Sequence, residues 1–177
     1  WDLPWDVDLE GEIPAPLDPL KERVVDPSGA SGSFRTIGEA VALGLHDAGY
    51  NVVIAARRVA ELERVAAKGK PGTGRFAVVA CDVAKEADVI HLFAEARRQF
   101  SHLDVLFNNA GIFAQGVHID EISLDDWQNV VNVNLTGAFL CAREAVRMMK
   151  AQTPIGGRII NNGSISSQVP RPLSVPY

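Results

Sequence analysis

Cysteine, net positive charge and long apolar runs are all scarce in this sequence. Its 177 residues include only two cysteines, Cys81 and Cys141, and each lies inside an apolar segment. We interpret them as core residues of a protein from a reducing compartment, neither a disulfide framework nor a metal site, and expect a cytoplasmic location. The 17 basic and 22 acidic residues leave a net charge of -5, which argues against a nucleic-acid groove or an anionic membrane surface as partner.

Membrane and targeting signals are also missing from the sequence. No apolar run approaches the roughly 18 residues that cross a bilayer, and the acidic N-terminal stretch has no positively charged region of the kind that begins a signal peptide. Because 47% of the residues are hydrophobic, the chain can bury one sizeable core. It begins with Trp1 rather than methionine and stops at Tyr177, so we expect that both ends are cut.

Two segments differ in composition. Residues 1–20 combine prolines and acidic residues with no basic residue and no apolar period, which predicts an extended or disordered lead-in. Residues 21–177 are predicted to form one domain, because short apolar runs there alternate with helical patterns. The predicted strands are Val24-Val25, 51–56, 76–80, 105–107 and 158–161. The predicted helices begin near Ile37, cover 59–67 and 85–100, and extend from a cap at Ser123 and Asp126 to about Lys150.

This alternation predicts right-handed crossovers and a parallel sheet with helices on both faces. The expected fold is therefore α/β, a doubly wound Rossmann-like sheet in three layers, with strand order 3-2-1-4-5 and an incomplete C-terminal part.

Apolar spacing predicts which face each helix buries. The helix that begins near Ile37 is predicted to bury Ile37, Ala40, Val41, Gly44, Leu45 and Ala48. The helix at 85–100 is predicted to bury Val89, Phe93, Ala96 and Phe100. The long helix is predicted to bury Trp127, Val131, Asn134, Ala138, Cys141 and Ala145. Asn134 is the exception among these, because a carboxamide in a core costs roughly 1–3 kcal/mol unless it is partnered. A functional role therefore explains this residue better than stability does.

Ligands of such sheets bind at the carboxyl ends of the strands. A glycine-rich turn at 28–38 leads into a helix, where backbone N–H groups bind phosphate; it could also be a plain connector. The second strand ends on Ala56, and Arg57 follows it, where an arginine can pair a 2′-phosphate or simply lie in solvent at a helix start. Asp82 follows the third strand and can accept from an adenine amino group, cap the next helix, or do both. The amides and glycine at 108–111 follow the fourth strand and require hydrogen-bond partners.

The last twenty residues bring together a strand, a serine and a tyrosine. Ser164 lies thirteen residues before Tyr177, and Pro170, Pro172 and Pro176 keep the intervening segment out of a helix. Such a segment can position two hydroxyl groups so that both hydrogen-bond to one carbonyl oxygen.

These pieces resemble the classical short-chain dehydrogenase/reductase family across residues 24–177. The similarity rests on the glycine-rich turn before TIGEAVALGL, on Asp82-Val83, on NNAG at 108–111, on VNLTG at 133–137, and on Ser164 with Tyr177. It implies an oxidoreductase that uses NADP, or alternatively NAD, to interconvert a small alcohol and a ketone, and a homo-oligomer for the full-length protein. It also implies that Asn134 holds a proton-relay water, Ser164 binds the substrate oxygen and Tyr177 is the acid/base. The cofactor-binding residues implied are Gly29, Gly32, Arg35, Ile37, Gly38, Arg57, Asp82, Val83, Asn109, Ala110 and Gly111.

Two departures from the family pattern affect these expectations. The glycine-rich turn can be aligned with the family pattern in two ways. If Ser28 is its first residue, the chain has three residues more than the pattern before Ile37 and Gly38. If Ser31 is its first residue, the spacing fits but Thr36 stands where the family has a glycine. In addition, the family's catalytic lysine would follow Tyr177, so we expect the chain as given to be inactive. The alternative functions are a non-catalytic nucleotide-binding or interaction module on the same fold and, less favoured, a member of the sugar-nucleotide epimerase branch.

Overall fold

A computed structural model describes residues 36–113 and 116–164, together with residues 166, 168, 169, 172, 173, 175 and 176. All of these belong to one compact unit. The predicted lead-in at 1–20 and the predicted first strand at Val24-Val25 lie outside the described residues.

The described strands form two parallel pairs. Strand β1 (Val52–Ala56) pairs with β2 (Phe76–Ala80), with Val52 opposite Phe76 and Ala56 opposite Ala80. Strand β3 (Val105–Asn108) pairs with β4 (Arg158–Asn161), which sets Asn108 opposite Asn161. The expected neighbours 3-2 and 4-5 are thus confirmed as parallel pairs, and the strand boundaries agree with the prediction to within one residue.

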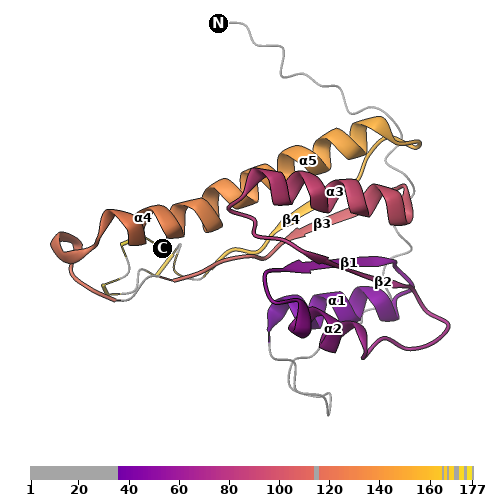
Figure 1. Cartoon of the computed structure of the whole chain (residues 1–177), viewed down its shortest axis with the longest axis horizontal. Coiled ribbons are helices and arrows are strands. Elements are labelled where there is room, and N and C mark those ends of the chain that lie inside the picture. The colour runs from indigo at the N-terminus through magenta and orange to yellow at the C-terminus, as the bar shows by residue number, and fades with distance from the viewer. Residues whose placement is uncertain are drawn as a thin grey trace, which may run out of the picture. The chain divides into compact units, whose positions relative to one another are not determined.

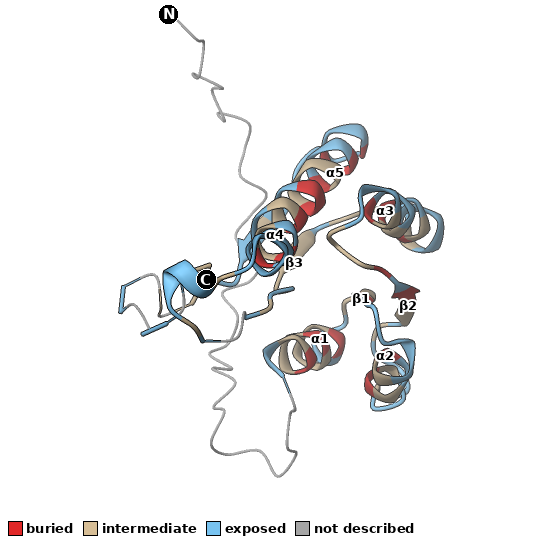
Figure 2. Cartoon of the chain, turned by 60° about the vertical axis from the view of Figure 1, so that its left-hand side comes forward, coloured by how far each residue is buried: buried red, intermediate tan, exposed pale blue. Residues whose placement is uncertain are grey.

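Helices pack on both faces of the strands. The elements are α1 (Ile37–Asp47), α2 (Val59–Ala66), α3 (Glu86–Phe100), the 3-10 turn η1 (Ile119–Glu121), α4 (Leu124–Val131), the π-helical segment η2 (Asn132–Gly137) and α5 (Ala138–Ala151). Helix α1 contacts β1, α2 contacts β1 and β2, α3 contacts β2, and α5 contacts β3 and β4 (Figure 1). With α1 and α2 on one side and α3 and α5 on the other, the α/β fold class is confirmed (Figure 2). Among the described residues, no helix is long and apolar enough to cross a membrane.

Two apolar clusters stabilise these layers. One joins α3 to α5 and includes Val89, Phe93 and Ala145; the other joins α1, α2 and β1 around Ile54. The α3 stripe is confirmed at Val89, Phe93 and Ala96, which are buried, whereas its fourth predicted member, Phe100, is only half-buried. Both cysteines are buried and free, and burial raises the pKa of Cys81 to about 11, so its thiol stays protonated. Their predicted place in the core is confirmed.

The predicted buried face of α1 is wrong in part. Glu39, Ala42 and His46 are its buried residues, whereas Ile37 is 60% exposed. Polar side chains are tolerated inside because they find partners on other elements. Glu39 binds Arg64 of α2 and Lys68, which lies two residues beyond the end of that helix, and the His46 ring stacks on Phe76 with centroids 4.5 Å apart.

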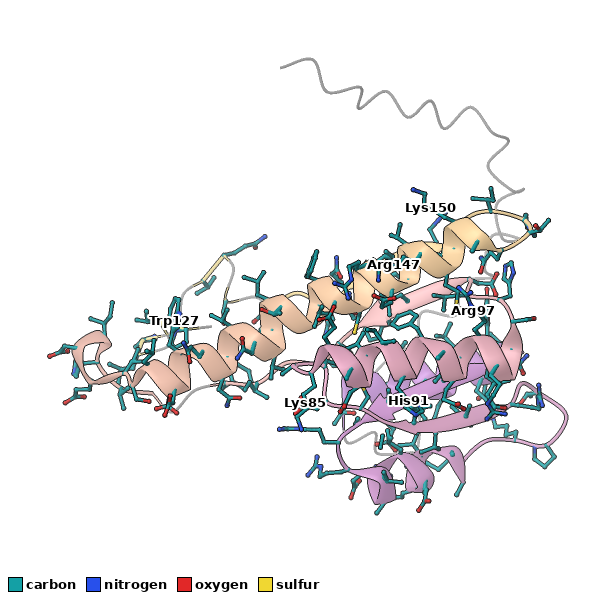
Figure 3. The ribbon with its side chains drawn as sticks, turned by 45° about the horizontal axis from the view of Figure 1, so that its top comes forward. Lys85, His91, Arg97, Trp127, Arg147 and Lys150 are labelled. Carbon is teal, nitrogen blue, oxygen red and sulfur yellow. The ribbon has the colours of Figure 1, made fainter. Side chains whose placement is uncertain are left out.

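The predicted stripe of the long helix is also wrong at its N-terminal end. Cys141 and Ala145 are buried as predicted, but Trp127 is 43% exposed, and Val130 and Val133 are buried in this region (Figure 3). The helix begins where predicted, because Ser123 Oγ accepts from the Asp126 N–H at 3.0 Å. The π segment then adds a residue to a turn and rotates the preceding face relative to the following one.

Candidate functional site at the carboxyl ends of the strands

One cavity of about 860 Å³ is lined along β1 and β3, where the predicted strand order places Val24-Val25, and it also reaches the carboxyl ends of the strands. At those ends it is lined by polar side chains and glycines from four parts of the chain. The predicted site residues among its lining are Gly38, Arg57, Asp82, Val83, Asn109, Ala110, Gly111 and Asn134. The fold therefore brings together residues that are almost a hundred positions apart in the sequence.

The first turn of α1 forms one wall of this region. Thr36 is the N-cap, and its Oγ1 accepts from the Glu39 N–H at 3.1 Å. A Cβ placed on Gly38 would lie 2.8 Å from Asn109 Nδ2. Because a side chain at position 38 would displace this amide, glycine allows the start of α1 to approach the end of β3. Ile37, predicted beside it, is largely exposed.

Charged residues follow β1. Arg57 and Arg58 come directly after Ala56, and both are exposed and line the cavity. Arg58 has the N-cap position of α2 but makes no side-chain cap bond. This end of the cavity thus carries guanidinium groups that can bind an anion.

Asp82 and Val83 follow β2. Asp82 Oδ1 accepts from the Ala84 N–H at 3.2 Å, and the N–H of Asp82 donates to Asp88 Oδ2 at 3.0 Å. The N-cap of α3 is Lys85, so the side chain of Asp82 holds the turn before the helix and does not cap the helix itself. Val83 packs against the π segment, where a Cβ on Gly137 would lie 2.8 Å from Val83 Cγ2.

Four asparagines connect the ends of β3 and β4. Asn108 Nδ2 donates to Asn161 Oδ1 at 2.9 Å, and Asn162 Nδ2 donates to Asn109 Oδ1 at the same distance. The amides of NNAG thus find part of the partners they require on the neighbouring strand. The prediction missed Asn161 and Asn162, although a second Asn-Asn pair at a strand end repeats the signal at 108–109.

Asn134 lies in the π segment and fastens the loop after β3. Its Oδ1 accepts from the Ile112 N–H at 2.8 Å, and its Nδ2 donates to the Ile112 carbonyl at 3.0 Å. Gly111 is close by, since a Cβ there would be 3.6 Å from Asn134 Oδ1. This half-buried carboxamide is therefore satisfied by one residue, because it hydrogen-bonds to both the N–H and the carbonyl group of Ile112.

Ser164 follows β4 by three residues and is half-buried. Its Oγ accepts from the Ser166 N–H at 3.1 Å. Tyr177, together with Gly29, Gly32 and Arg35, lies outside the described residues. The geometry between Ser164 and Tyr177 therefore stays a prediction.

Comparison with known proteins identifies what this arrangement is similar to. A family model described as short chain dehydrogenase matches residues 30–177. The human protein named dehydrogenase/reductase SDR family member 11 is 36% identical over 165 residues, which cover 91% of this chain and 61% of that protein. A 3beta-hydroxysteroid dehydrogenase of Mediterraneibacter gnavus is 34% identical over 147 residues, covering 83% of this chain and 52% of that protein.

A solved structure shows the same likeness in three dimensions. The 3-ketoacyl-(acyl-carrier-protein) reductase of Brucella melitensis, complexed with NADH, matches with a TM-score of 0.73 and 31% sequence identity. The match covers 79% of this chain and 57% of the reductase. The chain spans between half and two thirds of the length of these relatives, and over that span it belongs to the short-chain dehydrogenase/reductase family of oxidoreductases.

Proposed function

We propose that this chain binds a nicotinamide dinucleotide at the carboxyl ends of its strands, and that the complete protein interconverts an alcohol and a carbonyl compound by hydride transfer. The observation that carries the proposal is the gathering of Gly38, Val83, Asn109 and Asn134 around one cavity at those ends. Turnover is assigned to the complete protein because these 177 residues span 52% to 61% of the relatives' length.

The described residues fit a dinucleotide. Gly38 leaves the first turn of α1 without a side chain that would displace Asn109, and the N–H groups at the start of a helix favour a phosphate. The exposed guanidinium of Arg57 lines the same cavity and supplies positive charge. Asp82 Oδ1 holds the Ala84 N–H, and the carboxylate has further lone pairs for an adenine amino group.

The chemical roles follow from the hydroxyl groups near the chain's end. The bound nicotinamide ring supplies or accepts the hydride. Ser164 Oγ donates a hydrogen bond to the substrate oxygen, and the phenol of Tyr177 exchanges a proton with that oxygen. A free phenol titrates near 10, so proton transfer at neutral pH requires nearby positive charge that stabilises the phenolate.

Asn134 supports this chemistry as a positioning residue. Its two hydrogen bonds to Ile112 hold the loop that carries Asn109 and Gly111. A carboxamide has two donor hydrogens and two acceptor lone pairs, so the same side chain retains the capacity to bind the proton-relay water.

The preferred dinucleotide is the form with a 2′-phosphate. Ala56 offers nothing to a ribose diol, whereas Arg57 can pair a phosphate bidentately. A charge-assisted pair of this kind contributes about 1.5–3 kcal/mol, or roughly tenfold to a hundredfold in affinity.

Calorimetric titration of NADPH and NADH tests both statements. Wild type should bind NADPH roughly tenfold to a hundredfold more tightly, and Arg57→Ala should remove most of that difference. Arg97→Ala is the matched control, because Arg97 is an exposed arginine of α3 that does not line the cavity (Figure 3). Absence of binding by wild type would contradict the dinucleotide site. Equal affinity for both dinucleotides in wild type and Arg57→Ala would contradict the 2′-phosphate assignment alone.

A further inference from the structure

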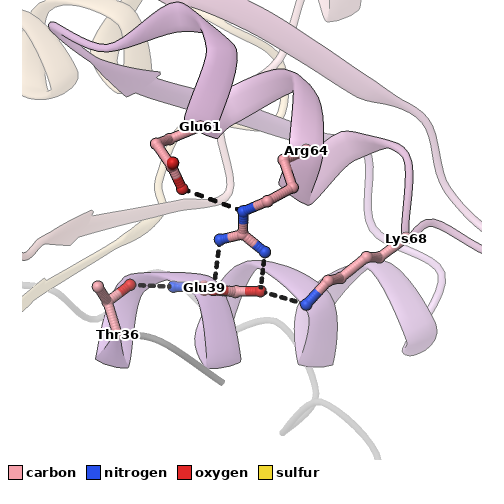
Figure 4. Close-up of polar contacts among 5 residues, drawn as sticks. All are labelled: Thr36, Glu39, Glu61, Arg64 and Lys68. Atoms are coloured by element: carbon pink, nitrogen blue, oxygen red, sulfur yellow. Dashed lines mark hydrogen bonds and ion pairs between the residues drawn. The ribbon is translucent and has the colours of Figure 1, made fainter. Parts of the chain in front are cut away.

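Four charged side chains connect α1 to α2 and form what we call the α1–α2 charge cluster: Glu39, Glu61, Arg64 and Lys68 (Figure 4). Arg64 grips both oxygens of Glu39, with Nη1 3.0 Å from Oε1 and Nη2 2.9 Å from Oε2. Its Nε donates to Glu61 Oε2 at 3.0 Å, and Lys68 Nζ donates to Glu39 Oε1 at 2.6 Å. The hydrogen bond to Glu39, followed by that to Glu61, raises the pKa of Arg64, which therefore stays charged.

Glu39 is an unusual acid because of where it is buried. Its side chain is only 2% exposed, and it directly follows Gly38 in the first turn of α1. An acidic residue there is favourable for the helix dipole. The same turn, however, is the one whose N–H groups face the proposed dinucleotide, so an unneutralised carboxylate would repel the phosphates.

Arg64 and Lys68 remove this conflict. The four side chains carry two negative and two positive charges, and both oxygens of Glu39 accept from α2. Gly38, Glu39, Arg57 and Arg64 all line the same cavity. Because Glu39 directly follows Gly38, the cluster lies beside the proposed anion site, and its four charges balance one another while it is intact.

We propose that Arg64 is a positioning residue for dinucleotide binding: it turns the Glu39 carboxylate toward α2 and neutralises it, so that the first turn of α1 meets the phosphates without a competing negative charge. The proposal rests on the proposed function, namely that this end of the cavity binds NAD(P). It gives Arg64 and Glu39 opposite effects on affinity, although both side chains belong to one ion pair.

Titration of NADH and NADPH into the full chain tests this at low and at high salt. Arg64→Gln should weaken binding by roughly threefold to thirtyfold at low salt, because Lys68 alone then faces the carboxylates of Glu39 and Glu61 and the cluster gains a net negative charge. The loss should be larger for NADPH, which carries more negative charge, and smaller at high salt. Glu39→Gln should instead tighten binding by about twofold to tenfold, because it leaves the cluster with excess positive charge.

Arg98→Gln is the matched control, since Arg98 forms a similar ion pair with Glu95 at 2.7 Å on α3 but does not line the cavity; its dinucleotide affinity should equal that of wild type. Circular dichroism checks that each variant is folded. If Arg64→Gln fails to fold, the change in dinucleotide affinity of Glu39→Gln tests the proposal by itself, because the proposal requires that affinity to increase. Weaker binding by both variants, or no change in either, would overturn this proposal and leave the proposed function standing. Absence of binding by wild type would overturn both.

Discussion

Around β3, β4 and the π segment the site is built from amides and glycines, whereas around α1 and α2 it is built from paired charges. In the first region Asn134 grips the Ile112 backbone, and Asn108 and Asn109 bind the amides at 161 and 162. In the second, Glu39 is held by Arg64 and Lys68. Hydrogen bonds between neutral groups are insensitive to salt, and those of Asn134 also hold a backbone segment in place. Ion pairs respond to salt and to the charge of a ligand.

The largest effect on stability is expected in the amide region, from Asn134→Ala. This change leaves the N–H and carbonyl of Ile112 without their side-chain partners and should lower the free energy of unfolding by about 3 kcal/mol. Urea denaturation at low and high salt measures it, and the loss should be the same at both. Asn132→Ala, at an exposed asparagine of the same π segment, should change stability by less than about 0.5 kcal/mol. Equal losses in the two variants would contradict the role given to Asn134.

Two glycines extend the comparison to backbone packing. Alanine at position 137 would place its Cβ 2.8 Å from Val83 Cγ2 and 3.1 Å from the Val83 carbonyl oxygen, so Gly137→Ala should destabilise the fold by roughly 1–3 kcal/mol. Among the described residues, none lies within 4 Å of a Cβ placed on Gly44 of α1, and Gly44→Ala should stabilise by about 0.5–1 kcal/mol through helix propensity. Thermal unfolding measures both changes: the melting temperature should fall for Gly137→Ala and rise for Gly44→Ala. A stabilising Gly137→Ala would show that the π segment does not need its close approach to Val83.

The smallest effect is expected in the charged region, from Lys68→Met. Lys68 is partly exposed, and Arg64 still neutralises Glu39, so the loss should be roughly 0.5 kcal/mol at low salt and should shrink as salt is added. Lys70→Met is the control. Its partner Asp47 lies 2.6 Å away but both side chains are exposed, and no measurable change is expected. A salt-independent loss for Lys68→Met would remove the distinction between the two regions.

Much of the fold could be predicted because its signals are local. The apolar runs at 76–80 and 158–161 predicted the bounds of β2 and β4, and their alternation with helices predicted parallel pairing. The candidate site could be predicted in part for the same reason, since polar residues at strand ends meet at one edge of a sheet. Asn109 and Gly111 were predicted in this way, whereas Asn134 was singled out as a carboxamide in the predicted buried stripe of the long helix.

Contacts between distant residues could not be predicted. Asn161 and Asn162 were missed, although their pairing with Asn108 and Asn109 follows directly from the register of β3 and β4. The buried face of α1 was misassigned because apolar spacing cannot show that Glu39 pairs with Arg64 of α2 and with Lys68 just beyond it. The exposure of Trp127 was missed because the helix pattern assumes a constant period, which the π segment interrupts.

The amino-acid sequence by itself determined the strands and helices, the parallel direction of the pairs and the kinds of residue at the strand ends, because each depends on hydrophobic period and chain handedness over short stretches. Only the tertiary structure decided that Asn134 holds Ile112, that Gly38 meets Asn109 and that Glu39 turns to Arg64. Each of these contacts joins residues more than twenty positions apart. Their hydrogen bonds and ion pairs form only after packing has removed the competing water and brought the partners within reach.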